Sequence, residues 1–129
     1  RDDLQGISST LETHGDLNMA ILNAGTCEYL EIADYDSAVI ENNINTNVVG
    51  TARCLDIALP ALRRTVAKGQ PATLVIVSSS AWWFPFGRAE GYGASKAARQ
   101  PRAPRSHPGI TCSPALYGTL RINYDSWPC

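Results

Sequence analysis

The 129-residue sequence lacks the features that mark membrane, secreted, metal-binding and nucleic-acid-binding proteins. It has no apolar run near the length of a membrane span, and no basic segment followed by an apolar one at its amino terminus. No Cys-x-x-Cys pair and no closely spaced pair of histidines occurs, so we predict no metal site. The formal net charge of −1 gives no electrostatic basis for a nucleic-acid partner. We therefore expect a globular protein of one domain's length, with neither a membrane nor nucleic acid as partner.

The four cysteines are widely scattered along the chain, at Cys27, Cys54, Cys112 and Cys129. An even number permits disulfides, but no spacing typical of a small disulfide-rich domain is present. We interpret them as free thiols in a reducing compartment, which predicts a cytoplasmic protein.

Composition changes abruptly after Ala98. Residues 1–98 carry seven basic and eleven acidic side chains, whereas residues 99–129 carry four arginines, one aspartate and five of the eight prolines. A stretch so rich in Arg and Pro sustains no helical period. We therefore expect two parts, a structured 1–98 and an irregular tail over 99–129.

Within 1–98, apolar spacing predicts alternating helices and strands. Residues 1–14 are typical of an amphipathic helix packed on a sheet, and 17–22 of a short buried strand. A long helix is expected over 34–62, with Asp34 as N-cap, a cluster of poor helix-forming asparagines in its middle, and a kink or new turn at Pro60. The β-branched run 73–79 predicts a parallel strand covered on both faces. This order favours an α/β fold.

A phenol, a cation and a hydroxyl recur at short spacings near this last strand. Tyr92 and Lys96 are four residues apart, which places them on one face of a helix that starts near Tyr92. Ser79 ends the strand thirteen residues upstream. A free phenol is a poor base at neutral pH unless a nearby positive charge favours the phenolate. Together the three groups could move a proton at a carbonyl or alcohol oxygen.

Four elements in this order resemble the short-chain dehydrogenase/reductase family, classical type, over roughly residues 1–98. They are Asn23-Ala24-Gly25, Asn47-Val48-Val49-Gly50, Ser79, and Tyr92-Gly93-Ala94-Ser95-Lys96. The resemblance implies a partial Rossmann-like, doubly wound parallel sheet, made of the family's strands 4 and 5 with flanking helices. It also implies an NAD- or NADP-dependent oxidoreductase that transfers a hydride to or from a small-molecule carbonyl or secondary alcohol.

The resemblance assigns a role to each matching residue. Tyr92 gives or takes the proton, Lys96 assists it and hydrogen-bonds the nicotinamide ribose, and Ser79 polarises the substrate oxygen. The backbone carbonyl of Asn47 would hold a water that leads from the lysine to solvent. The family also lines its cofactor site with the turn Asn23, Ala24 and Gly25, where small residues let the cofactor approach the backbone closely.

Several of these positions leave alternatives open. Ser78 and Ser80 compete with Ser79, although strand alternation points them to the other side. Asn43 and Asn45 are near alternatives to Asn47. The aromatic residues between Ser79 and Tyr92 are interpreted either as core or as the lining of an apolar substrate pocket. These aromatic residues are Trp82, Trp83, Phe84 and Phe86.

The sequence also departs from the family pattern. It contains no glycine-rich turn of the form Thr-Gly-x-x-x-Gly-x-Gly, and its sole methionine is Met19, inside a predicted strand. Nothing after Ala98 matches the long helix, strand and Pro-Gly turn that the resemblance implies. We therefore expect a catalytic-half fragment truncated at both ends. Translation of the other two reading frames past Ala98 would test whether a shifted frame produced the tail.

The leading hypothesis is the catalytic middle of a short-chain oxidoreductase. The alternative is a non-catalytic remnant or a partner-dependent α/β fragment, and the two differ in whether the polypeptide can bind a dinucleotide. The family also pairs its subunits through helices that correspond to 34–62 and to the one that begins near Tyr92. A homo-oligomer formed through these helices is therefore a further hypothesis, which light scattering would test.

A polypeptide of these 129 residues should show no measurable dehydrogenase activity, because it lacks the phosphate-binding turn that delivers the dinucleotide. Titration with NADH and NADPH, followed by their fluorescence, measures this directly. Tight binding of either cofactor would contradict the prediction.

Overall fold

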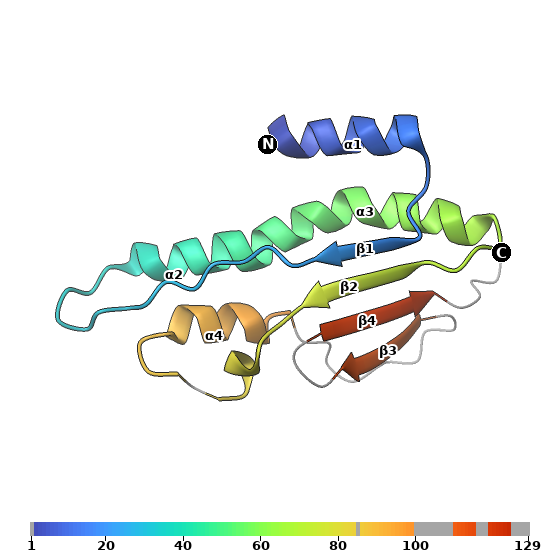
Figure 1. The fold of residues 1–129 in the computed structure, drawn as a ribbon. Helices are drawn as coiled ribbons and strands as arrows, with labels where there is room; N and C mark the ends of the chain where they lie inside the picture. The colour runs from blue at the N-terminus through green and yellow to red at the C-terminus, as the bar shows by residue number, and fades with distance from the viewer. Residues whose placement is uncertain (1, 85, 100–109, 116–118, 125–129) are drawn as a thin grey trace.

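The structure of the protein is a computed structural model, which describes residues 2–84, 86–99, 110–115 and 119–124. Helices and strands alternate along the chain, as the sequence predicted (Figure 1). The elements are α1 (Asp2–His14), β1 (Met19–Leu22), α2 (Ser37–Ile44), a π-helical turn (Asn45–Val49), α3 (Gly50–Ala67), β2 (Thr73–Val77), a 3₁₀ turn (Ser80–Trp82), α4 (Glu90–Ala97), β3 (Ile110–Ala115) and β4 (Thr119–Tyr124). The predicted α/β class is confirmed.

Strands β1 and β2 are parallel, with Met19 opposite Thr73 and Leu22 opposite Ile76. The connection between them runs through α2, the π-helical turn and α3, which follow one another as a single long rod (Figure 1). Because the strands are parallel, their carboxyl ends meet at one edge of the sheet. Figure 1 shows both arrowheads directed toward the side where α4 lies. This edge positions the candidate site.

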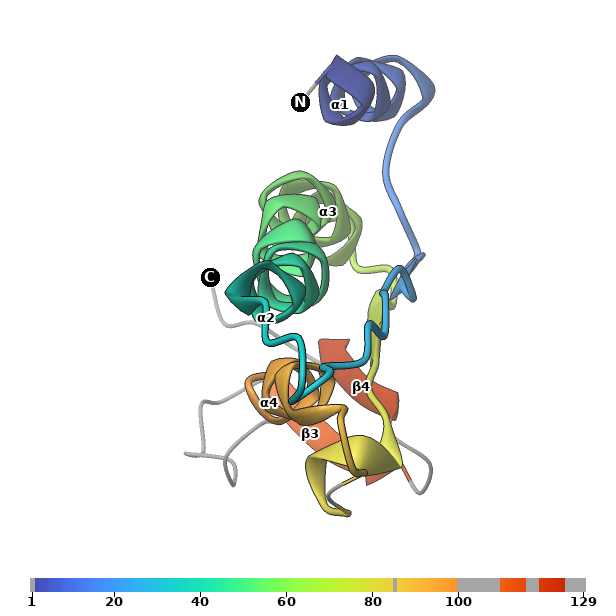
Figure 2. The same cartoon turned by 90° about the vertical axis from the view of Figure 1, so that its left-hand side faces the viewer.

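The hydrophobic core lies between α3 and the two parallel strands. It is built from buried small and branched side chains, namely Ala20, Ala58, Leu62, Ala72, Leu74 and Ile76. On β1 the burial alternates, so Ala20 is buried while Met19 and Ile21 are 52% and 59% exposed. The main contact of α1 is with α3, and Figure 2 shows α1 beyond α3, away from the strands. The expectation that α1 packs on the sheet is therefore wrong.

The long helix differs from its prediction at both the start and the middle. Its N-cap is Asp36, not Asp34, because the Asp36 carboxylate accepts a hydrogen bond from the Ala38 N–H at 2.9 Å. Pro60 starts no new turn, since α3 continues through it from Gly50 to Ala67. The irregularity falls on the asparagine cluster, where the Gly50 N–H donates to the Asn45 carbonyl five residues back.

The tail is not irregular throughout, which corrects the prediction for part of 99–129. Strand β4 pairs antiparallel with β2, and β3 pairs antiparallel with β4, giving the sheet order β1-β2-β4-β3. Without β4, one edge of β2 would expose unpaired N–H and C=O groups. The alternating apolar residues of 119–124 suit a strand that pairs with this edge. Arg99 lies in the turn after α4, and the other positions of the tail lie outside the described residues.

Pro60 gives a test of helix α3. Pro60→Ala should raise the free energy of unfolding by about 2–3 kcal/mol, because proline in a helix interior lacks one N–H and crowds the preceding turn. Pro60 is exposed, so the change removes little packing. Urea unfolding followed by circular dichroism measures the difference.

The matched control is Pro71→Ala, at an exposed position outside any helix. This change should lower the free energy of unfolding by up to about 1 kcal/mol, because it frees the unfolded chain. Equal effects of the two substitutions would contradict the prediction.

Candidate active site

Helix α4 presents two chemically different faces. Tyr92, Ser95 and Lys96 lie on one face, and Arg99 in the following turn continues it, since these positions are separated by three, four or seven residues. Glu90, Gly93 and Ala94 lie on the other. The Lys96 ammonium sits over the Tyr92 ring, 5.3 Å from its centroid, which is within cation–π range. The structure therefore brings the two motif residues together.

Two glycines on either side of Tyr92 let α4 approach its neighbours closely. A Cβ on Gly91 would lie 3.1 Å from the Ile40 Cα in α2, and a Cβ on Gly93 would lie 3.1 Å from the Ala81 carbonyl oxygen. Either contact would be tighter than nine in ten real Cβ contacts, so the neighbouring backbone would have to shift by a few tenths of an ångström. The glycines therefore fix the depth at which Tyr92 sits in the molecule.

The Lys96 side chain is 4% exposed and ends beside Gly25, in the segment that leaves β1. A Cβ on Gly25 would lie 3.0 Å from the Asn47 Oδ1 and 3.3 Å from the Lys96 Nζ, so only glycine fits without displacing them. Burial lowers the pKa of Lys96, the positive charge of Arg99 lowers it further, and the Cys27 thiol opposes both effects. The ammonium is thus shielded from solvent beside the end of β1.

Asn47 connects the segment after β1 to helix α4. Its side chain is fully buried, its Oδ1 accepts from the Thr26 N–H at 2.8 Å, and its Nδ2 donates to the Thr26 carbonyl at 2.9 Å and to the Ser95 Oγ at 2.8 Å. The Ser95 hydroxyl in turn donates to the Tyr92 carbonyl at 2.7 Å. The Asn47 carbonyl accepts from the Thr51 Oγ1 at 2.7 Å.

Asn43 repeats this arrangement one helical turn earlier. It is also fully buried, its Oδ1 accepts from the Glu28 N–H at 3.2 Å, and its Nδ2 donates to the carbonyls of Glu28 and Val39. The two amides therefore pair with the backbone of Thr26 and Glu28 as a neighbouring strand would. Sequence reasoning kept Asn43 only as an alternative and missed Ser95. The spacing of Asn43 and Asn47, four residues apart inside a helix, is the sequence signal that could have identified these two buried amides as a pair.

The three consecutive serines have three different environments. Ser78 is buried, and its Oγ donates to the Lys96 carbonyl at 3.5 Å. Ser79 is half-buried, and its Oγ accepts from the Ala81 N–H at 3.2 Å, where it caps the 3₁₀ turn. Ser80 is exposed as the first residue of that turn. Of the three, Ser79 keeps its hydroxyl proton available near α4, since it is engaged as an acceptor.

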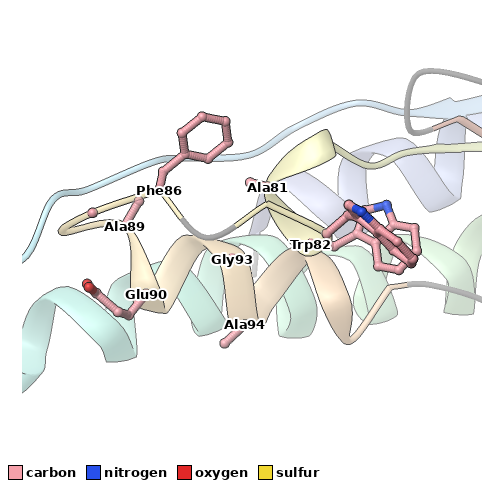
Figure 3. Close-up of a pocket in the computed structure, with 9 residues that line it drawn as sticks. Ala81, Trp82, Phe86, Ala89, Glu90, Gly93 and Ala94 are labelled. Atoms are coloured by element: carbon pink, nitrogen blue, oxygen red, sulfur yellow. The ribbon is translucent and has the colours of Figure 1, made fainter.

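Three of the four aromatic residues lie beside the face of α4 that carries Glu90, Gly93 and Ala94, which we call its outer face. The face that carries Tyr92 and Lys96 is called its inner face. Trp82, Trp83 and Phe86 line a pocket of about 430 Å³ together with Glu90, Gly93 and Ala94, whereas Phe84 is not among its lining residues. The rings of Trp82 and Trp83 meet edge to face, with centroids 5.2 Å apart. In Figure 3 the labelled Phe86 and Glu90 lie at one end of the pocket and Trp82 at the other. Tyr92 is not among the lining residues, so the structure separates these aromatics from the inner face.

The turn that the sequence predicted to bind a cofactor is exposed at the end of β1. Asn23, Ala24 and Gly25 are exposed at the carboxyl end of β1, and the Lys96 ammonium reaches the same point. Small exposed residues beside a buried ammonium suit a polar ligand that lies close to the backbone. Within the described residues, no group of three potential metal ligands gathers, and no helix is long and apolar enough to cross a bilayer.

Comparison with known proteins gives matches over the same part of the chain. The family model described as short chain dehydrogenase matches residues 2–101. A 3-dehydrosphinganine reductase of Arabidopsis thaliana, TSC10A, is 28% identical over 94 residues, covering 73% of this chain and 28% of the relative.

Solved structures show the same likeness. The Pseudomonas aeruginosa RhlG complex with NADP superposes with a TM-score of 0.66 at 29% identity, over 74% of this chain and 38% of that one. A short chain dehydrogenase of Escherichia coli CFT073 complexed with NADPH gives 0.62 at 25% identity, over 75% and 40%. The chain therefore spans less than half the length of these relatives.

The buried contact between Asn47 and Ser95 can be tested by one substitution. Ser95→Ala should lower the free energy of unfolding by about 1–3 kcal/mol, because it leaves a buried Asn47 N–H without its acceptor. Chemical denaturation gives the value. The matched control is Ser9→Ala, an exposed helical serine whose hydroxyl donates to Gly6, which should change stability by less than about 0.5 kcal/mol. A Ser95→Ala effect as small as that of the control would show that the contact contributes little.

Proposed function

The chain belongs to the short chain dehydrogenase family, and on that basis we propose that its residues perform the proton-transfer half of an NAD- or NADP-dependent oxidoreduction. The substrate class is a small-molecule carbonyl or secondary alcohol. The observation that carries the proposal is the Lys96 ammonium, which is buried between the Tyr92 ring and Gly25 at the carboxyl edge of the parallel strands. Ligands of open α/β sheets bind at that edge.

In this proposal Tyr92 is the group that exchanges a proton with the substrate oxygen. During reduction its phenolic proton passes to the oxygen of the carbonyl, and during oxidation it returns from the alcohol. The adjacent ammonium stabilises the tyrosine when it has given up its proton, since opposite charges attract strongly in a dry site. The glycines beside Tyr92 support this role because they set the depth of the helix.

Ser79 is proposed to hold the substrate oxygen during the transfer. Its Oγ accepts from the Ala81 N–H, which orients the hydroxyl and leaves its proton to donate to a substrate oxygen. A donor placed where negative charge develops stabilises the transition state. The neighbouring Ser78 is instead directed to the carbonyl of Lys96, which supports the choice of Ser79.

The cofactor would be held by Asn23, Ala24 and Gly25 together with Tyr92 and Lys96. When bound, a nicotinamide ring supplies or accepts the hydride. Lys96 would donate to the ribose hydroxyls, and Gly25 would allow close approach. The family resemblance assigns the Asn47 backbone carbonyl to a water that replaces the proton, and the amide of Asn47 keeps the segment after β1 in position.

The loop between Ser79 and Tyr92 is proposed to contact an apolar part of the substrate. Its four aromatic side chains, Trp82, Trp83, Phe84 and Phe86, are 40–69% exposed. Exposed aromatic surface of this extent is usually an interaction site.

A second candidate function is a partner-dependent α/β fragment, with residues 1–98 as the interacting part and 99–129 as an appended tail. The observation that favours it is the exposed apolar face of β1, where Met19 and Ile21 have no cover among the described residues. Pairing of two copies through the 34–62 segment and α4 belongs to the same proposal. The free thiols Cys27 and Cys54 suit a reducing compartment, and the cytoplasmic location stays a prediction.

A chimera tests the proposed chemistry. Residues 2–98 would replace the matching segment of Pseudomonas aeruginosa RhlG, which supplies the parts of a full-length dehydrogenase outside that segment. We expect the chimera to oxidise NADPH with a ketone, and Tyr92→Phe to lower kcat at least about 100-fold, the usual contribution of a general acid. The matched control Tyr35→Phe, at an exposed position, should leave kcat within about twofold.

Absorbance at 340 nm measures turnover, and NADPH fluorescence checks that each variant still binds the cofactor. A chimera that binds NADPH but does not turn over would favour the non-catalytic alternative. Equal activity of the Tyr92→Phe and Tyr35→Phe variants would remove Tyr92 from the mechanism.

A further inference from the structure

Arg99 is a buried cation whose polar atoms are only partly satisfied. It lies in the turn that follows α4, where its backbone N–H donates to the Lys96 carbonyl at 3.2 Å, and its side chain is directed back to β1. The residue is 8% exposed. Its Nη2 donates to the Leu22 carbonyl at 3.4 Å, which is long for a hydrogen bond, and its buried Nε and Nη1 have no partner.

No carboxylate compensates this charge within the described part of the chain. The ion pairs recorded there join Asp16 to Arg64 and Lys68, and Glu31 to Arg88. Burial lowers the pKa of Arg99, with the Tyr92 phenol as the opposing influence, yet a guanidinium remains protonated in proteins. A buried charge without a partner is among the costliest features that a fold can carry. Some group of opposite charge would relieve it.

Lys96 places a second buried cation in the same region. Lys96 and Arg99 are three residues apart on the inner face of α4, and each ends on the segment that leaves β1, the first beside Gly25 and the second at Leu22. Neither shares an ion pair with a described acidic residue. Two like charges held side by side repel each other, and both would gain from one anion near them.

We infer that Arg99 and Lys96 form a binding site for a phosphate-class oxyanion at the carboxyl end of β1. A guanidinium binds phosphate oxygens through several N–H groups at once, and an ammonium adds a point charge. The two residues that follow Leu22 in the chain, Asn23 and Ala24, are exposed, so the chain at the end of β1 meets solvent. This site shares Lys96 with the proposed cofactor site, but its test measures anion binding rather than hydride transfer, so the two proposals can fail separately.

Thermal unfolding of the 129-residue chain with inorganic phosphate tests the inference. We expect saturating phosphate to raise Tm by at least about 3 °C above sodium chloride of equal ionic strength, because an anion that binds only the folded state stabilises it. Arg99→Leu should abolish this rise. Without phosphate the same variant should melt at or above the wild-type Tm, because it no longer buries an unpaired charge.

Arg63→Leu is the matched control, because it removes the same charge from an exposed position of α3 and should keep the phosphate response. If Arg99→Leu does not fold, Arg99→Met and the broadening of the ³¹P signal of phosphate by the wild-type chain give the same comparison. The Tm response to AMP is measured in the same way, with adenosine as its reference. The comparison with inorganic phosphate shows whether the site binds a free anion or a phosphate attached to a nucleoside.

A response to AMP alone that depends on Arg99 would assign the site to a nucleotide phosphate, and a response to both would assign it to the free anion. The inference is overturned if neither anion raises Tm beyond chloride, or if Arg99→Leu responds as the wild type does. It is also overturned if Arg99→Leu melts below the wild type without phosphate, since the guanidinium would then already have a favourable partner.

Discussion

The candidate site depends on one buried amide. Asn47 satisfies both backbone groups of Thr26 and also donates to Ser95, so a single side chain joins the end of β1, the π-helical turn and helix α4. These segments are distant in the sequence and share no strand pairing. Because the side chains of Asn47 and Ser95 are fully buried, moving any one segment would leave a donor or acceptor without a partner. The position of Tyr92 and Lys96 relative to Gly25 follows from this constraint.

The helix that carries Asn47 is irregular where it makes this connection. Asparagine is a poor helix former, and the turn Asn45–Val49 adopts the wider π geometry. Asn43, one turn earlier, uses its side-chain amide in the same manner to hydrogen-bond the backbone of Glu28. The chain between β1 and α2 therefore gains the hydrogen bonds that a neighbouring strand would give, but from side chains. The low helix propensity of asparagine is thus overridden where these side chains make tertiary hydrogen bonds, which is typical of functional segments.

Local patterns predicted the elements well, and long-range contacts account for what they missed. The apolar runs around Ala20 and Val75 indicated the two parallel strands, and the spacing of Tyr92 and Lys96 indicated one helix face; both are seen in the structure. The spacing of the asparagines could indicate that Asn43 and Asn47 act together, but it could not identify the partners of Asn43 and Ser95 that lie 15 and 48 residues away. Strand β4 was missed because its pairing depends on the free edge of β2, which composition alone does not reveal.

The two faces of α4 divide the chemistry of the site. The inner face gathers a phenol and two cations against the end of β1, whereas the outer face carries only Glu90 and small residues beside the aromatic loop. A helix backbone separates the two environments, so the charges on the inner side are not screened by what occupies the pocket. Arg99 lies on the same side of α4 as Lys96, where its buried Nε and Nη1 have no hydrogen-bond partner, so two buried cations share the end of β1 with little to compensate their charge.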